Sequence, residues 1–137
     1  MKARIKLEKG MRLAGINEQG LISYFDTNKN FGGEESAPTP MQILLQSVGA
    51  CTSLDVLSML RKRKKTIDSF EVILDAERAT EHPKVLTKIN LKFELKSPDT
   101  NINELNDIIN LSQEKYCGVS IMVKRSGCEI YWEAKII

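Results

Sequence analysis

The fold of this chain is decided by Thr39–Leu60, which reads TPMQILLQSVGACTSLDVLSML. Thr39, Pro40 and Gln42 form the pattern of a capping box with proline at the first helical position, so we predict that a helix begins here. Apolar residues from Ile43 to Leu60 fall on most sides of this helix, which predicts a buried central helix. We expect it to be too polar for a membrane span because of five side chains: Gln46, Ser47, Ser53, Asp55 and Ser58.

The residues before this helix are typical of strands. Ala3, Ile5 and Leu7 alternate with charged residues, the period-2 pattern of a half-buried strand. We expect Met11–Ile16 to be a return strand and Gly20–Asp26 to be a third. The segment Thr27–Pro38 is rich in Asn, Gly and Pro, which predicts a loop.

The residues after the helix predict a hairpin, a second helix and a last strand. Phe70–Ala76 and Val85–Leu95 both alternate apolar and polar residues, and we expect them to pair antiparallel. Asn101 is placed to cap a second helix that reaches Tyr116, followed by a short apolar piece, Val119–Val123. In a final strand, Cys128, Ile130, Trp132, Ala134 and Ile136 share one face. The predicted order is βββ-α-ββ-α-β, a single α+β domain over residues 1–137 with a mostly antiparallel sheet.

Composition excludes several classes of protein. The chain has 137 residues, 42% of them hydrophobic and 28% charged, which is typical of a globular domain and not of a disordered or fibrous chain. A net charge of +2 gives no electrostatic reason to expect nucleic acid as a partner. We interpret the basic run Arg61–Lys65 as a helix C-terminus whose cations favour the helix dipole; a patch for nucleic acid or acidic lipid is the alternative.

The three cysteines raise the question of chemistry. An odd number cannot all pair within one chain, and Met1–Gly10 does not resemble a signal peptide, so we expect a cytoplasmic protein without a disulfide framework. By position, Cys51 is typical of a small core residue inside an apolar helix. Cys117 lies at a helix end beside Gly118, where it is either a thiol favoured as thiolate by a following helix or an inert cap residue. Strand parity places Cys128 in the core.

Neither a metal site nor a cofactor site is predicted. The cysteines lack close ligand spacing, and the single histidine, His82, precedes Pro83 in a turn. A thiol protease is poorly supported because His82 is the only available imidazole base.

The chain resembles the OsmC/Ohr family of osmotically inducible and organic hydroperoxide resistance proteins, specifically its OsmC-like subgroup. The resemblance lies first in Pro40–Leu45 and Gly49–Val56, followed by Leu60 and the basic run. It continues through further motifs in the expected order: Gly32-Gly33-Glu34, Pro38, Glu77-Arg78, His82-Pro83, Leu111-Ser112 and Glu114-Lys115-Tyr116-Cys117.

This resemblance implies a thiol-dependent peroxidase. Cys51 matches the family's peroxidatic cysteine and Cys117 its resolving cysteine. The family forms an intertwined homodimer of α+β subunits, reduces organic hydroperoxides, and is re-reduced by dithiols such as protein-bound lipoyl groups. Reaction of a Cys51 thiolate with the peroxide would leave a sulfenic acid, with which Cys117 would condense to a disulfide.

The chain departs from the family pattern at the charges around Cys51. Family hydroperoxide reductases have a glutamate after the helix-opening proline, paired with an arginine, whereas this chain has Met41 and then Gln42. Arg12 lies on the corresponding hairpin without the family's arginine motif, and an exposed strand cation is the alternative interpretation. Asp55, one helical turn after Cys51, is expected to raise the thiol pKa. A second hypothesis is therefore a non-catalytic or weakly catalytic dimer that binds a small apolar ligand or acts as a thiol redox switch.

Overall fold

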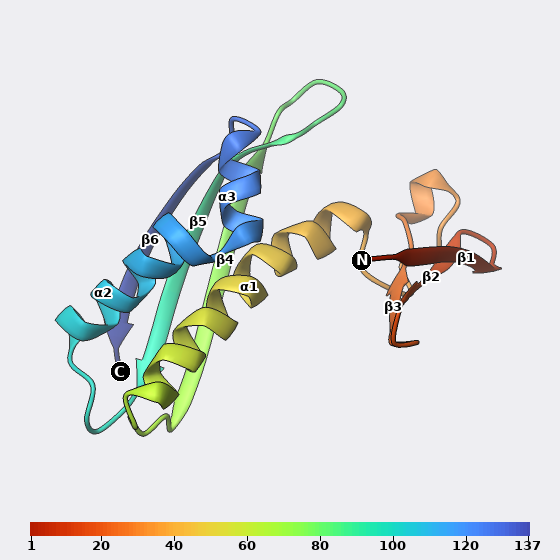
Figure 1. Cartoon of the computed structure of the whole chain (residues 1–137). Helices are drawn as coiled ribbons and strands as arrows, with labels where there is room; N and C mark the ends of the chain where they lie inside the picture. The colour runs from red at the N-terminus through yellow and green to blue at the C-terminus, as the bar shows by residue number, and fades with distance from the viewer. The chain divides into compact units, whose positions relative to one another are not determined.

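The computed structural model describes all 137 residues, Met1–Ile137. The chain divides into an N-terminal unit, Met1–Leu44, and a C-terminal unit, Leu45–Ile137. Six strands and three α-helices confirm the α+β class (Figure 1). The prediction of a single domain over residues 1–137 stays a prediction.

The N-terminal unit is a three-stranded antiparallel sheet. Its strands β1 (Ala3–Lys9), β2 (Arg12–Asn17) and β3 (Ile22–Phe25) pair in that order, as predicted, and a 3-10 turn at Lys29–Phe31 follows. The expectation that β1 is half-buried is wrong within this chain, because every β1 residue is exposed, Ile5 and Leu7 at 61% each. Only Ala14 and Asp26 are buried in the whole unit.

A polar network orders the loop that follows β3. The Asp26 carboxylate accepts hydrogen bonds from the backbone N–H groups of Thr27 and Ser36, at 2.7 and 3.0 Å, and from the Ser36 hydroxyl at 2.6 Å. These bonds, led by the one from the Ser36 hydroxyl, lower the pKa of Asp26 from 3.8 to about 2. Gly33 is required in the same loop, since a Cβ there would overlap the Thr27 carbonyl.

The C-terminal unit contains a second sheet, ordered β4-β5-β6. Strands β4 (Ser69–Arg78) and β5 (Leu86–Lys96) form the predicted antiparallel hairpin, whereas β6 (Glu129–Ile136) pairs parallel to β5. Three of the four strand pairings in the chain are therefore antiparallel, but they belong to two sheets and not one. The parallel pairing requires a crossover connection, which the helices between β5 and β6 provide.

That connection contains more helix than predicted. Helix α2 (Ile102–Leu111) begins at the predicted cap, where the Asn101 side chain accepts a 2.9 Å hydrogen bond from the Glu104 N–H. A π-helical turn, Ser112–Tyr116, follows, and α3 (Gly118–Arg125) contains the piece predicted only as short and apolar. The observed order is βββ-α-ββ-αα-β. The sequence did not predict α3 because the helix begins at Gly118, and glycine is a poor helix former.

Helix α1 (Pro40–Lys62) has the predicted capping box. The Thr39 N–H donates to Gln42 Oε1 at 2.9 Å, and the Gln42 N–H donates to Thr39 Oγ1 at 3.3 Å. The prediction of a helix buried on most sides is only partly met within this chain. Val48, Val56 and Leu60 are fully buried, but Leu54 on another side is 69% exposed.

Helix α1 is long and apolar enough to cross a membrane, judged by length and composition only. The expectation that its polar residues make it too polar for a span is therefore wrong by hydropathy. One such helix is weak evidence, because a core helix of a soluble protein passes the same test. At its end, the predicted basic residues find partners in α2: Arg63 and Lys65 form ion pairs with Glu104 at 3.2 and 3.1 Å.

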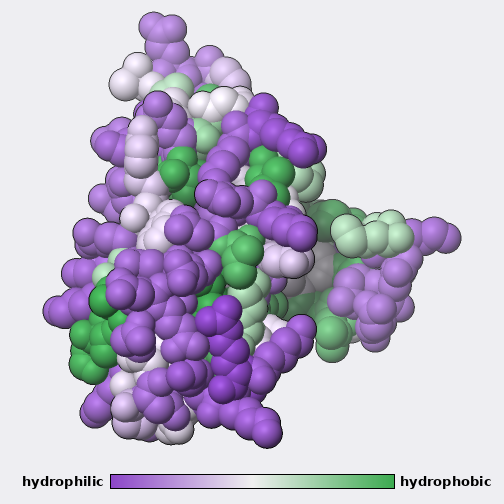
Figure 2. All heavy atoms as spheres, turned by 60° about the vertical axis from the view of Figure 1, so that its left-hand side comes forward, coloured by the Kyte–Doolittle hydropathy of each residue, from purple (hydrophilic) through white to green (hydrophobic).

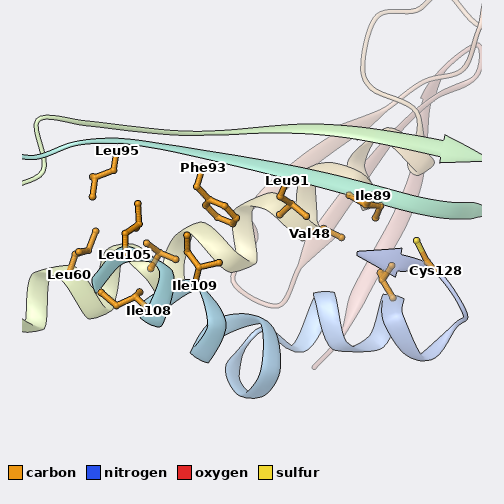
Figure 3. Packing of buried hydrophobic residues seen from close by; sticks show 12 residues of the cluster. Val48, Leu60, Ile89, Leu91, Phe93, Leu95, Leu105, Ile108, Ile109 and Cys128 are labelled. Atoms are coloured by element: carbon orange, nitrogen blue, oxygen red, sulfur yellow. The ribbon is translucent and has the colours of Figure 1, made fainter. Parts of the chain in front are cut away.

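The core of the C-terminal unit lies between its sheet and its helices. Ile89, Leu91, Phe93 and Leu95 point from β5 towards α1 and α2 (Figure 3). Phe93 is fully buried and meets the Trp132 ring edge-on at a centroid distance of 6.3 Å. The face of the molecule seen in Figure 2 is mostly hydrophilic, with separate hydrophobic patches among the polar side chains.

Candidate active site

The C-terminal unit brings two of the three cysteines together. Cys51 lies on α1, and Cys117 is the N-cap of α3, directly after the π-helical turn. Their thiols lie close enough for each to shift the pKa of the other, although the residues are far apart in the sequence. Cys51 is partly exposed and Cys117 is fully buried, so solvent reaches the pair from the Cys51 side.

Cys117 is surrounded by hydroxyl groups. The Thr52 hydroxyl donates to the Cys117 sulfur at 3.3 Å, the Ser120 hydroxyl lies 3.1 Å from it, and the Ser120 N–H donates to it at 3.4 Å. Burial opposes ionisation of this thiol, but the hydrogen bonds from Ser120 and Thr52 outweigh it and lower the pKa of Cys117 below its ordinary value.

Gln113 stands behind these hydroxyls. Its side-chain Nε2 donates to Thr52 Oγ1 at 2.8 Å and approaches Ser120 Oγ at 3.4 Å, while its backbone carbonyl accepts a 3.3 Å hydrogen bond from Lys124 Nζ. The side chain is buried, and its Oε1 has no hydrogen-bond partner. A buried acceptor without a partner is uncommon in a folded protein and calls for an explanation.

Cys51 has a less favourable environment for a thiolate. Burial, the neighbouring Cys117 and the Asp55 carboxylate raise the pKa of Cys51, and the Val119 N–H, which donates to its sulfur, offsets this only in part. The expected effect of Asp55 is therefore present. Asp55 is held in place by the Ser112 hydroxyl, which donates to its Oδ2 at 2.8 Å.

The N-terminal unit holds the other residues singled out in the sequence. Arg12 donates to Glu8 Oε1 and to the Ser36 carbonyl, both at 2.9 Å, and its guanidinium lies 4.4 Å from the Tyr24 ring centroid. Gln42 closes the capping box of α1. Arg12 and Gln42 thus both have defined structural partners within this unit.

The remaining candidates lie outside the cysteine pair. Cys128 is 4% exposed and belongs to the hydrophobic cluster, which confirms the prediction that it is a core residue; burial raises the pKa of its thiol. His82 lies in the loop between β4 and β5. No three His, Cys, Asp or Glu side chains lie close enough together to hold a metal ion.

A cavity of about 390 Å³ adjoins the site through Asp55. Its other lining residues include the apolar Met59 and Leu111, with Lys62 and Tyr116 supplying polar ends. The volume is suited to a small organic molecule.

Sequence reasoning missed Thr52, Gln113 and Ser120. A signal existed for Ser120, because Cys117 and Ser120 have the spacing of an N-cap and the third helical residue, whose N–H the cap accepts. Thr52 and Gln113 meet only through tertiary packing of α1 against the π-helical turn, which no local pattern encodes.

Comparisons with known proteins agree with this fold. Residues 32–133 match the family model described as OsmC-like protein. Protein YhfA of Escherichia coli K12 is 33% identical over 126 residues, which cover 92% of this chain and 91% of that protein.

Two solved structures have the same fold. A hypothetical protein from Aquifex aeolicus VF5 has a TM-score of 0.81 at 28% identity, covering 99% of this chain and 96% of its own. An organic hydroperoxide resistance protein OsmC from Legionella pneumophila has a TM-score of 0.67 at 15% identity, with 98% and 97% coverage. The family match includes both Cys51 and Cys117 and spans most of the sequence, and the chain therefore belongs to the OsmC-like protein family.

Proposed function

We propose that the protein is a thiol-dependent peroxidase that reduces organic hydroperoxides through Cys51 and Cys117. The observation that carries this proposal is the proximity of the two thiols, each of which shifts the pKa of the other. Neighbouring thiols on two different segments are the arrangement from which a disulfide bond of roughly 2.05 Å forms. The partly exposed Cys51 is the thiol that a peroxide can approach.

The proposed peroxidase reaction has three steps. The Cys51 thiolate attacks one peroxide oxygen; the O–O bond breaks, Cys51 becomes a sulfenic acid, and the alkoxide takes a proton to leave as an alcohol. The Cys117 thiolate then attacks the Cys51 sulfur, forming the disulfide and releasing hydroxide, which becomes water. An external dithiol, with a lipoyl group as the proposed class, reduces the disulfide to two thiols and is itself oxidised.

The proposed substrate class rests on the cavity at Asp55, one helical turn from Cys51, although Cys51 itself does not line it. The cavity at Asp55 is lined partly by Met59 and Leu111, which favours an alkyl hydroperoxide over hydrogen peroxide. The Legionella pneumophila neighbour is named as an organic hydroperoxide resistance protein, in line with this choice. We place the protein in the cytoplasm, where a reducing environment suits three free cysteines.

We also propose that the working form is a homodimer. In the N-terminal unit, Ile5, Leu7 and Leu21 are each more than half exposed, and Leu54 of α1 is 69% exposed. Apolar side chains in such number favour burial against a second copy of this chain. Light scattering after size-exclusion chromatography tests this directly: a dimer has twice the 15.5 kDa of the chain, and a value of one chain mass contradicts it.

The test of the enzyme is consumption of tert-butyl hydroperoxide by the purified protein with dihydrolipoamide as reductant. We expect steady turnover by wild type and loss of turnover in Cys51→Ser. Cys128→Ser is the matched control and should keep its activity, because Cys128 lies in the core away from the pair. Equal inactivity of wild type and Cys51→Ser would remove the peroxidase from consideration.

A second candidate function is favoured by the environment of Cys51. Its raised pKa, with Asp55 contributing, points to a slow thiol that acts as a redox switch or binds a small apolar ligand without efficient turnover. The same assay separates the two functions. A switch forms the Cys51–Cys117 disulfide once after peroxide treatment but does not consume hydroperoxide continuously.

A further inference from the structure

The two thiols of the pair differ in a way that the proposed reaction does not require. Both must react, yet Cys117 is fully buried and Cys51 is partly exposed. Polar partners are concentrated on Cys117, whose sulfur accepts from the Thr52 hydroxyl and the Ser120 N–H and whose thiol donates to Ser120 Oγ. Cys51 has only the Val119 N–H as a donor, and the Asp55 carboxylate nearby opposes its ionisation.

Gln113 orients the hydroxyl groups of Thr52 and Ser120 that surround the Cys117 sulfur. Its Nε2 donates to Thr52 Oγ1, so the single proton of that hydroxyl goes either to the Val48 carbonyl at 3.1 Å or to the Cys117 sulfur at 3.3 Å. A thiolate at Cys117 is the stronger acceptor of the two and draws this proton. The same Nε2 approaches Ser120 Oγ, which accepts from the protonated Cys117 thiol. When Cys117 is a thiolate, the Ser120 hydroxyl proton can instead be donated to its sulfur. Gln113 Oε1 has no hydrogen-bond partner, so the bonds that orient this buried amide are those from Nε2 to the two hydroxyls.

We propose that Thr52, Ser120 and Gln113 are positioning residues that hold Cys117 as the leaving thiolate, so that the reducing dithiol opens the Cys51–Cys117 disulfide by attacking Cys51. This inference rests on the proposed peroxidase function. A thiolate of the dithiol forms a bond to the Cys51 sulfur, the Cys51–Cys117 bond breaks, and its electron pair leaves on the Cys117 sulfur. The second thiol of the dithiol then displaces Cys51 and is oxidised to the cyclic disulfide.

Two physical reasons select this direction. An incoming thiolate reaches the partly exposed Cys51 sulfur, whereas the Cys117 sulfur is covered. Disulfide exchange is also faster when the departing sulfur is stabilised as a thiolate, and the donors that would stabilise it are those around Cys117. Access and leaving-group stability therefore favour the same outcome.

The experiment uses the full chain oxidised with diamide, with glutathione as the probe. After a short reaction and alkylation with N-ethylmaleimide, peptide mass spectrometry locates each group. We expect glutathione on Cys51 and the maleimide on Cys117, with a preference of about tenfold or more. Glutathione on Cys117, an even distribution, or no disulfide after diamide overturns the proposal.

Variants test the positioning residues themselves. Thr52→Val and Gln113→Met should reduce both the exchange rate and the preference for Cys51, and Thr52→Ser should restore them by restoring the hydroxyl. Ser53→Ala and Ser126→Ala are matched controls, because their hydroxyls bond only to the Gly49 and Val123 carbonyls. Unchanged exchange in Thr52→Val and Gln113→Met would contradict the assigned role.

A spectroscopic readout separates positioning from general structural damage. In a Cys51→Ser background, thiolate absorbance at 240 nm reports the titration of Cys117 as pH is raised. Adding Thr52→Val should move this titration upward by about one pKa unit, the order expected for the loss of one hydrogen bond to an anion. No shift in a folded variant overturns the role of Thr52.

Because diamide forms the disulfide without peroxide, these results do not depend on the peroxidase assay. A protein that lacks turnover but gives glutathione on Cys51 fails the proposed function and keeps the exchange direction. A protein that turns over but gives glutathione on Cys117 keeps the function and loses the inference.

Discussion

The two units of the chain are stabilised by different physics. The C-terminal unit has a cluster of twelve buried residues between its sheet and its helices. The N-terminal unit buries a single apolar residue, Ala14, and its loop is ordered by hydrogen bonds to the Asp26 carboxylate. A unit with so little buried apolar surface depends on β-ladder and loop hydrogen bonds and on whatever covers its apolar side chains.

The largest effect is expected in the C-terminal core. Phe93→Ala removes a fully buried ring that contacts Phe70 and Trp132, and it should lower the free energy of unfolding by about 3–5 kcal/mol. Urea titration followed by tryptophan fluorescence measures this through Trp132. A loss below about 1 kcal/mol would mean that the core is not what stabilises this unit.

The next effect tests what covers the N-terminal unit. Leu7→Asp places a charge in the exposed apolar face of β1 and should weaken the proposed dimer about a hundredfold, because a charge is costly to bury. Sedimentation velocity over a concentration series measures the dissociation constant. Lys6→Asp, on the opposite face of the same strand, is the comparison; equal weakening by both changes would point to an effect of net charge only.

A smaller effect is expected in the loop of the N-terminal unit. Gly33→Ala would overlap the Thr27 carbonyl, and because the contact is backbone it should cost about 1–3 kcal/mol. Gly20 has a positive φ, which Gly33 does not, and a Cβ there meets no atom within 4 Å, so Gly20→Ala reports backbone strain without overlap. Amide hydrogen exchange of residues 27–38 should accelerate in Gly33→Ala and not in Gly20→Ala.

The smallest effect is a pH dependence carried by Asp26. Its pKa is about 2 in the fold against 3.8 ordinarily, so its contribution to stability is complete above about pH 4 and is lost as pH falls through 2. Amide exchange of the Ser36 N–H should rise across that window in wild type. In Asp26→Asn the window should disappear, and a pH profile identical to wild type would show that another group controls the loop.

Local patterns predicted most of the elements. The capping box at Thr39 and the N-cap at Asn101 are both present, because a cap depends on residues within one turn. The alternation in Phe70–Ala76 and Val85–Leu95 predicted the hairpin, since neighbouring strands of this kind pair directly. Helix α3 was missed because Gly118 interrupts the pattern at its first turn.

The alternation of apolar and polar residues could not predict whether the apolar face of a strand is covered within the chain. Ile5 and Leu7 alternate as a buried face would, yet they are exposed within the chain, because alternation records which side is apolar and not what covers it. The parallel pairing of β6 was likewise not predictable, since it depends on the path of the connection and not on residues within the strand.

At the site, the position of Cys51 in an apolar helix predicted a core residue. Its pairing with Cys117 was predicted only from the family resemblance. The structure brings the two thiols close together, but their assigned catalytic roles remain proposals. The hydroxyls on Cys117 come from α1 and α3 at once, so Thr52 and Gln113 become visible only when those segments are packed.

The parallel strand β6 also has a consequence for the order of folding. During synthesis the β4–β5 hairpin is complete well before Glu129–Ile136 emerges, so the outer edge of β5 stays open in the meantime. That edge presents unpaired backbone groups of β5, including those of Ile89, Leu91 and Phe93, and open strand edges recruit strands from other chains. The nascent protein is therefore most prone to aggregate in the interval between its fifth and sixth strands, when α2 and α3 are still being made.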